Sequence, residues 1–383
     1  EKVTLTELAL VVSGATPDTI RLSAEGSFAM DTQVADLNLE LAIGSLTGEG
    51  KLRFASFASP QIDATLKLSE LNPALLILAG PEAAGAAAES SDTGGGAAAL
   101  PLHALRMIDT RAVLSIDTVV LDPHVLENVK ATLRVVDGVA TLDPVTATLH
   151  GGEIGFKAVF NARYNTARMN TEGAVKRLDL AQALGAMEAG VAASGKADLD
   201  WSLSGSGRSS EALTASLAGP INVNTQDITL EGIGMEQMLC RGVALANQQT
   251  LQAEFPTNTR FEALNAKIQL KDGIANLDPL TAQLPAVSLG GNGTLDLSSQ
   301  ELRASFRAQL SAALGELDPA CSLNERLTDL RWPVECKGNL ADDPAGWCGV
   351  NSAEIVKDLA EGELKRKAGK EAGKLFNKLF ERD

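Results

Sequence analysis

The stretch ATLRVVDGVATLDPVTATLHGGEIG, residues 131–155, is repeated in close copy as AKIQLKDGIANLDPLTAQLPAVSLG, residues 266–290. An Asp-Gly pair and an Asp-Pro pair stand at the same spacing in both copies. An insertion in either copy would have changed that spacing. The two stretches are therefore predicted to fold on one structural plan.

Each copy is predicted to be a β-hairpin. Apolar and polar residues alternate before the Asp-Gly pair, which is the pattern of a strand with one apolar face. Asp137-Gly138 and Asp272-Gly273 are typical two-residue hairpin turns, in which glycine supplies a positive φ. We expect Asp143-Pro144 and Asp278-Pro279 to end the return strand, because proline cannot donate a hydrogen bond to a sheet.

A looser unit also recurs along the chain. It consists of a glycine-rich bend, a strand, a polar turn, an alternating strand and then, in its first two copies, a short helix. The bends are expected at Gly48-Glu49-Gly50, at Gly151-Gly152 and at Gly290-Gly291. Three copies of one such unit predict an elongated, repetitive β architecture.

The sequence divides into four predicted parts. Residues 1–80 are read as strands of an N-terminal β region, truncated upstream and ending in a helical turn at 71–78. Residues 81–99 are rich in Ala, Gly and Ser and predict a flexible loop. Residues 100–350 form the main β region. Residues 351–383 predict an amphipathic helix with a basic run, which either caps the sheet or contacts anionic lipid.

Within residues 100–350, the clearest strand alternation runs from Ala197 to Leu203. Short helices are predicted at 178–184 (LDLAQAL), at 210–217 and at 233–246. The last of these helices carries Cys240.

Composition excludes several classes of protein. A formal net charge of −16 argues against nucleic acid as a partner and against adhesion to anionic membrane surfaces. No run of apolar residues is long enough for a membrane-spanning helix. The sequence opens in an alternating strand and not in a signal peptide. We therefore expect a piece of a longer protein, with any targeting or anchoring segment upstream.

The four cysteines lie in the last part of the chain, at positions 240, 321, 336 and 348. No CxxC pair is present and the histidines are distant, so neither a metal nor another cofactor is expected. An even, clustered number favours two disulfides in an oxidising compartment, with free buried thiols as the alternative. Of the three possible pairings, we favour Cys321–Cys336, which closes the loop SLNERLTDLRWPVE, together with Cys240–Cys348.

No catalytic motif is recognisable in the sequence, so we do not predict an enzyme. The patterns GxSxG and HExxH, the phosphate-binding loop and the dinucleotide fingerprint are all missing. His150 stands beside a glycine bend and is interpreted as structural. Asp342-Asp343 offers too few oxygen ligands for calcium.

Three stretches together resemble the AsmA family: LPLHALRMIDTRAVLSIDTVVL (100–121), NVKATLRVVDGVATLDPVTATLHGG (128–152) and DPACSLNERLTDLRWPVECKGN (318–339). The resemblance covers most of residues 100–350. It implies a mainly β fold: an elongated, curled antiparallel sheet that forms a repeating apolar groove, with short helices and a C-terminal α-helix. It also implies a periplasmic protein of a Gram-negative bacterium, held in the inner membrane by an N-terminal anchor missing from this sequence.

The same resemblance implies similarity to bridge-like lipid transfer proteins. The expected role is lipid transport and outer-membrane biogenesis, with phospholipid acyl chains and outer-membrane assembly factors as partners. Alternation alone fits a closed sandwich with a dry core equally well. With the resemblance, we expect an open groove. Its expected lining consists of the apolar residues of alternating strands: Leu37, Leu39, Leu41, Leu66, Leu68, Leu133, Val135, Leu199, Trp201, Leu203, Ile268 and Leu270.

An alternative function is a protein-interaction scaffold for outer-membrane protein assembly. An open sheet edge could accept a strand from a client β-barrel precursor by β-augmentation. This hypothesis predicts binding of unfolded strand peptides and no co-purified lipid.

Overall fold

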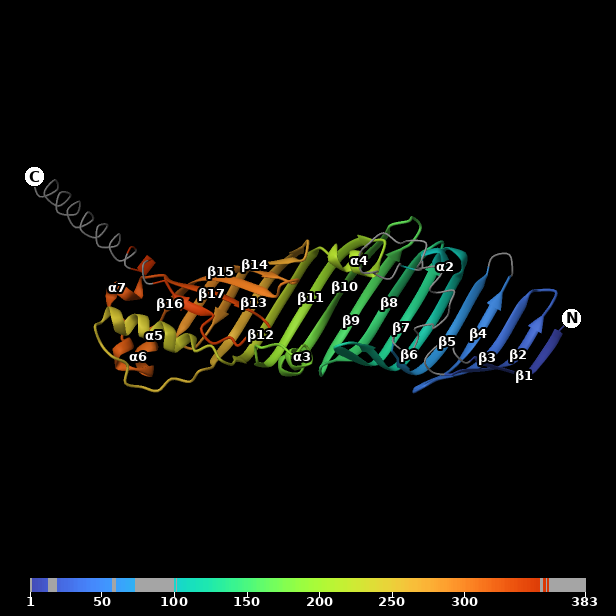
Figure 1. Cartoon of the computed structure of the whole chain (residues 1–383), viewed down its shortest axis with the longest axis horizontal. Coiled ribbons are helices and arrows are strands. Elements are labelled where there is room, and N and C mark those ends of the chain that lie inside the picture. Colours follow the sequence, from blue (N-terminus) through green and yellow to red (C-terminus); the bar gives the residue numbers. More distant parts are fainter. Residues whose placement is uncertain are drawn as a thin grey trace, which may run out of the picture. The chain divides into compact units, whose positions relative to one another are not determined.

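A computed structural model describes residues 2–12, 19–56, 60–72, 100, 102–351, 354–355 and 357 of the chain (Figure 1). The described residues are mainly β with a few short helices, as the sequence predicts. They form eighteen strands. The chain falls into two compact units. Unit 1 comprises Glu1–Met187, Ala197–Val223 and Gln269–Gly273, and unit 2 comprises Glu188–Lys196, Asn224–Ile268 and Ile274–Asp383.

Unit 1 is built from strands that pair in the order of the sequence. Neighbouring strands from β1 to β10 pair antiparallel, except that β5 and β6 pair in parallel. A parallel pair needs a long connection, which here spans the predicted loop at 81–99 and most of the predicted helix at 71–78. Both of those segments lie outside the described residues.

The ten strands are β1 (Lys2–Val12), β2 (Ile20–Ala29), β3 (Val34–Ile43), β4 (Leu46–Ala55), β5 (Gln61–Leu71), β6 (Asp109–Leu121), β7 (His124–Val136), β8 (Val139–Leu149), β9 (Gly152–Asn161) and β10 (Ala167–Asp179). Most of β11 (Ala193–Gly207) and the helices α2 (Leu102–Met107), α3 (Leu180–Ala186) and α4 (Ser210–Ala215) also belong to this unit.

The two predicted hairpin turns are confirmed. Asp137 and Gly138 have φ values of 48° and 72°, and Val136 pairs with Val139 across the turn. Asp272 and Gly273, with φ values of 51° and 74°, connect β13 (Thr259–Lys271) to β14 (Ile274–Gln283). Positive φ at both central residues is the signature of a type I′ turn, which suits the twist of the flanking strands.

The Asp-Pro pairs do not end their strands, so that prediction was wrong. Pro144 lies inside β8 and Pro279 lies inside β14. In each strand the register shifts at the proline, between Leu142 and Val145 and between Leu277 and Leu280. Such an irregularity leaves the proline outside the hydrogen-bond ladder while the strand continues.

Two of the predicted glycine bends were also wrong. Gly48-Glu49-Gly50 lies inside β4, and Gly290-Gly291 lies inside β15 (Val287–Asp296). A Cβ atom at Gly48 or Gly50 would come within 2.6 Å of a methyl group of Leu68 or Leu66. A Cβ atom at Gly291 would collide with the carbonyl oxygen of Ser305. Glycine is needed at these positions because a neighbouring strand approaches closely, and not because the chain turns.

Unit 2 combines an antiparallel sheet with helices. Strands β14 to β18 pair in sequence order. The remaining strands of this set are β16 (Glu301–Leu310), β17 (Trp332–Asn339) and β18 (Cys348–Val350), and the residues of β12 (Gly219–Leu230) and β13 are divided between the two units. The helices are α5 (Met235–Ala246), α6 (Leu314–Leu317), the 3-10 helix η2 (Pro319–Cys321) and α7 (Glu325–Thr328).

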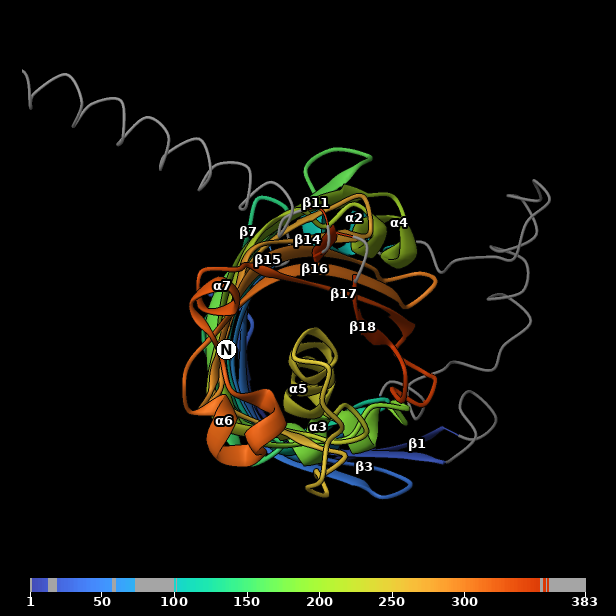
Figure 2. The same ribbon diagram turned by 90° about the vertical axis from the view of Figure 1, so that its left-hand side faces the viewer.

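The predicted helices at 178–184, 210–217 and 233–246 are confirmed as α3, α4 and α5. Helix α4 is capped by Ser209, whose hydroxyl accepts a hydrogen bond from the N–H of Ala212. Helix α5 lies beside β18 of its own unit (Figure 2) and buries Met235, Leu239, Cys240, Val243 and Ala244. Beyond Lys357, the predicted C-terminal helix lies outside the described residues.

The two predicted disulfides are present, but the favoured pairing was wrong. Cys240 pairs with Cys321, and Cys336 pairs with Cys348, so Cys321–Cys336 and Cys240–Cys348 do not form. Helix α5 packs on η2 and brings the Cα atoms of Cys240 and Cys321 to 5.1 Å. Cys336 and Cys348 are direct cross-strand partners on β17 and β18, with Cα atoms 4.0 Å apart. Register and helix packing decide the pairing, and neither can be read from cysteine spacing.

Asp318 clamps a loop of unit 2 to η2. Its side chain accepts hydrogen bonds from the N–H groups of Gln252 and Ala253, each at 2.7 Å, and from that of Ala320 at 2.8 Å. The residue is almost fully buried. The amides of Ala253, Ala320 and Gln252, in that order of effect, lower the pKa of the Asp318 carboxyl group, because they stabilise its charged form.

The disulfide pairing is testable by peptide mapping. Digestion of the oxidised protein without reductant is expected to release one linked peptide pair containing Cys240 and Cys321 and a second containing Cys336 and Cys348. Recovery of a peptide pair joining Cys321 to Cys336 by mass spectrometry would contradict the arrangement.

Asp318→Asn is expected to lower the midpoint of thermal unfolding at pH 7, because an amide nitrogen replaces one acceptor oxygen. A carboxyl group whose pKa is depressed by folding stabilises the protein above its unfolded pKa of about 3.9, and that contribution disappears as the pH falls through the folded pKa. The difference between wild type and variant should therefore be largest near pH 7 and shrink below about pH 4. Scanning calorimetry across this range provides the measurement, and a difference independent of pH would refute the assignment.

Candidate functional site

The register of unit 1 gathers apolar side chains on one face of the sheet. Directly paired residues point to the same side, so each register row belongs to one face. One row consists of Leu39, Gly50, Leu66, Leu114, Ala131, Val145 and Phe156. A second row consists of Leu37, Leu52, Ala64, Ala112, Leu133, Leu142 and Ala158. We call this surface, including the row of Leu41, Leu68 and Ile116, the apolar face.

Most of the predicted lining residues of unit 1 lie on this face. Leu37, Leu39, Leu41, Leu66, Leu68 and Leu133 are half-buried, and Val135 is buried. In β11, Leu199, Trp201 and Leu203 alternate along the strand and are half-buried as well. Ile268 and Leu270 lie on β13, where Ile268 is half-buried and Leu270 is buried.

Burial changes across the apolar face. Toward β6, β7 and β8 a buried cluster consists of Ile116, Val119, Val129, Ala131, Val145 and Ala147. Toward β3, β4 and β5 the leucines stay half-buried. On this face, β3 carries no polar side chain between Leu37 and Leu41, and the residues paired with this stretch on β4 and β5 are not polar either. The face is therefore a continuous aliphatic surface, closely packed on one side and accessible on the other.

Aromatic side chains lie at the β9–β11 end of this face. The ring centroids of Phe156 and Trp201 are 6.3 Å apart, and the indole N–H of Trp201 donates to the hydroxyl of Thr171 at 3.3 Å. A Cβ atom at Gly173 would come within 2.6 Å of the Trp201 ring. The hydrogen bond to Thr171 fixes the indole of Trp201, and the absence of a side chain at Gly173 lets the ring lie close to the strands.

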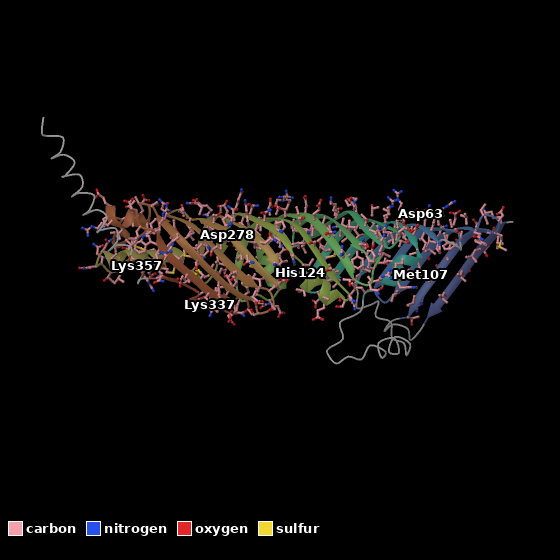
Figure 3. All side chains as sticks on the ribbon, turned by 90° about the horizontal axis from the view of Figure 1, so that it is seen from above. Asp63, Met107, His124, Asp278, Lys337 and Lys357 are labelled. Carbon is pink, nitrogen blue, oxygen red and sulfur yellow. A yellow bond between two sulfur atoms is a disulfide. The ribbon has the colours of Figure 1, made fainter. Side chains whose placement is uncertain are left out.

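The opposite face of unit 1 is polar and charged. One row alternates Asp36, Arg53 and Asp63, and the first two form an ion pair at 3.1 Å between side chains more than half exposed. Asp63 is labelled in Figure 3. A hollow of about 680 Å³ is lined by polar residues that include Lys67 and Glu49 and also by members of the first apolar row, Leu39, Leu66, Leu114 and Ala131. Exposed pairs contribute little stability, so this face mainly keeps the sheet soluble.

Sequence reasoning missed several members of the apolar face, including Leu114, Leu142, Val145 and Phe156. Leu142 and Val145 are three positions apart and yet face the same way, because the irregularity at Pro144 shifts the alternation. The alternation signal was therefore lost where the proline interrupts β8. Leu114 alternates with polar neighbours along the sequence, between Ala112 and Ile116, and could have been included.

His150 is paired with His124, which lies at the turn between β6 and β7 (Figure 3). Nδ1 of His124 is 2.9 Å from Nε2 of His150. Burial lowers the pKa of His150, the neighbouring His124 lowers it further, and Asp179 opposes the shift. Among the described residues, no group of three or more His, Cys, Asp or Glu side chains could hold a metal ion.

In the part of the chain that the structure describes, none of the helices has the length and apolar character to cross a membrane.

Comparison with known proteins defines the family of this chain. Residues 56–280 match the AsmA family. The chain is 23% identical over 232 residues to Protein AsmA of Escherichia coli (strain K12), an alignment that covers 60% of this chain and 36% of that protein. No solved structure matches the chain. Since the family match extends over more than half of the sequence, the protein belongs to the AsmA family.

Proposed function

We propose that the chain is a non-enzymatic lipid-handling module of the bacterial periplasm. In this proposal the apolar face is the wall of an open groove, formed by an elongated and curled antiparallel sheet. The groove binds the acyl chains of phospholipids. Its role is to support lipid transport and outer-membrane biogenesis, as part of a longer protein anchored in the inner membrane.

The half-buried leucines of β3 to β5 carry the proposal. A continuous aliphatic surface of this kind is an aggregation hazard unless a ligand or a partner covers it. Each CH₂ group of an acyl chain that moves from water onto such a surface gains about 0.8 kcal/mol. A chain of ordinary length can therefore be held without any polar recognition group. The face offers none over Leu37, Leu39 and Leu41.

Family membership supports the proposed location of the protein in the cell envelope. The chain is similar to Protein AsmA of E. coli over 36% of that protein's length, so the function of the whole protein is carried over here only as a proposal. Two disulfides within one unit favour an oxidising compartment, which agrees with the periplasm.

Leu66→Glu is expected to reduce phospholipid binding at least about tenfold, because a carboxylate in the middle of the face removes aliphatic contact and must stay hydrated. The matched control is Thr65→Glu, which places the same charge one residue away on the exposed opposite face. Native mass spectrometry of both variants, purified from bacteria and followed by lipid extraction, provides the measurement.

The two variants separate the groove from a dry core. Lipid lost in Leu66→Glu but retained in Thr65→Glu, with both proteins folded by circular dichroism, supports the groove. If Leu66→Glu unfolds the protein, the face is a packed core and the proposal fails. A lipid-free wild-type protein that binds unfolded strand peptides would favour the scaffold function instead.

Trp201 offers a direct reporter of the acyl chain. Phospholipid brominated on its acyl chains is expected to quench the emission of the wild-type protein more than unbrominated lipid does, since bromine quenches only at close contact. In a Trp347→Phe background, which removes the half-buried third tryptophan, Trp201→Phe should abolish this difference, while the fully buried Trp332 stays protected. Equal quenching of wild type and variant would show that lipid does not reach this part of the face.

A further inference from the structure

Unit 2 contains a cavity of its own, of about 700 Å³, between α5 and the segment that includes β18. Its lining comes from α5, from the loop that precedes it, from Thr257 and from Ala345, Gly346, Cys348, Val350 and Ile355. The volume lies in the range of pockets that bind small molecules. Every lining residue belongs to unit 2, and none is a member of the apolar face.

The cavity walls are mostly apolar. Ile233, Met238, Leu245, Val350 and Ile355 contribute aliphatic and thioether surface. Leu245 is 74% exposed, although Val243 and Ala244 beside it on α5 are buried. Its side chain is therefore available to a molecule that enters the cavity.

One cation stands in this apolar lining. Gln237, Arg241 and Leu245 follow each other at four-residue spacing, which places an amide, a guanidinium group and an aliphatic side chain along one face of α5. Within the described part of the chain, Arg241 forms no ion pair. A guanidinium group carries five N–H donors in a fork that matches a carboxylate or a phosphate.

The cavity walls are held in place by covalent and packing contacts. Cys240–Cys321 attaches α5 to η2, and Cys336–Cys348 attaches β18 to β17. Gly242 lets α5 lie close to Trp332, because a Cβ atom there would come 3.0 Å from the indole ring. A cavity formed before its ligand arrives loses little free energy to ordering when the ligand binds.

From this arrangement we infer that the cavity is a binding site for an amphiphile with one anionic group and an apolar body. Arg241 and Gln237 bind the carboxylate or phosphate, and the apolar body lies between Met238, Leu245 and Val350. The inference concerns unit 2 and does not depend on lipid binding by the apolar face of unit 1.

The test uses the oxidised full chain and three probes with the same twelve-carbon chain: dodecanoate and dodecyl phosphate below their micelle concentrations, and dodecanol below its solubility limit. Titration calorimetry should give at least about tenfold tighter binding of both anions than of the alcohol, as expected for a charge-assisted hydrogen bond. Inorganic phosphate alone should not compete, because it lacks the apolar body.

Arg241→Gln should weaken both anions about tenfold and leave dodecanol unchanged, whereas Leu245→Asn should weaken all three probes. The matched control is Arg260→Gln, which removes an equal charge. Arg260 is exposed, forms an ion pair with Asp227 and does not line the cavity. Arg260→Gln should bind like wild type.

Three results would overturn the inference: anion affinity that survives Arg241→Gln, equal binding of dodecanol and dodecanoate, or competition by inorganic phosphate alone. Leu66→Glu separates this site from the apolar face. It should lose phospholipid and keep dodecanoate, so either site can fail without the other.

Discussion

Cross-strand register is the constraint on which unit 1 depends. Side chains alternate between the two faces of a strand, so a slip by one residue would move every leucine of β3 or β5 to the charged side. The paired rows keep Leu39 and Leu66 on one face and Asp36 and Arg53 on the other. The apolar face exists because the backbone ladder holds this register across many strands, through the parallel step from β5 to β6.

Local irregularities preserve that register where the sequence would disturb it. At Pro144 and Pro279 the ladder shifts, so that a residue without an N–H group is accommodated and the apolar pattern resumes on the correct side. At Gly48 and Gly50 the missing side chains leave room for the methyl groups of leucines on the next strand. The register shifts at the prolines and the glycines within β4 therefore keep the apolar face continuous, and neither marks the end of a strand.

Unit 2 is stabilised by different means. Cys240–Cys321 fixes α5 to η2, Cys336–Cys348 fixes β18 to β17, and the buried carboxylate of Asp318 holds the loop at Gln252 and Ala253 to η2. These links join segments far apart in sequence and leave little freedom to the walls of the cavity beside Arg241. Unit 1 instead carries a surface whose aliphatic side chains on β3 and β5 are mostly half-buried.

The sequence by itself determined the mainly β class, the family, the two Asp-Gly turns, the helices α3, α4 and α5, and which alternating residues are apolar. All of these depend on local chemistry: period-two patterning, the positive φ of a turn glycine and the spacing along a helix. Only the tertiary structure decided that the Asp-Pro pairs lie within strands, that Cys240 pairs with Cys321, and that Val145 joins Leu39 on one face. Those outcomes depend on register shifts and on the packing of distant segments, which no local pattern in the sequence encodes.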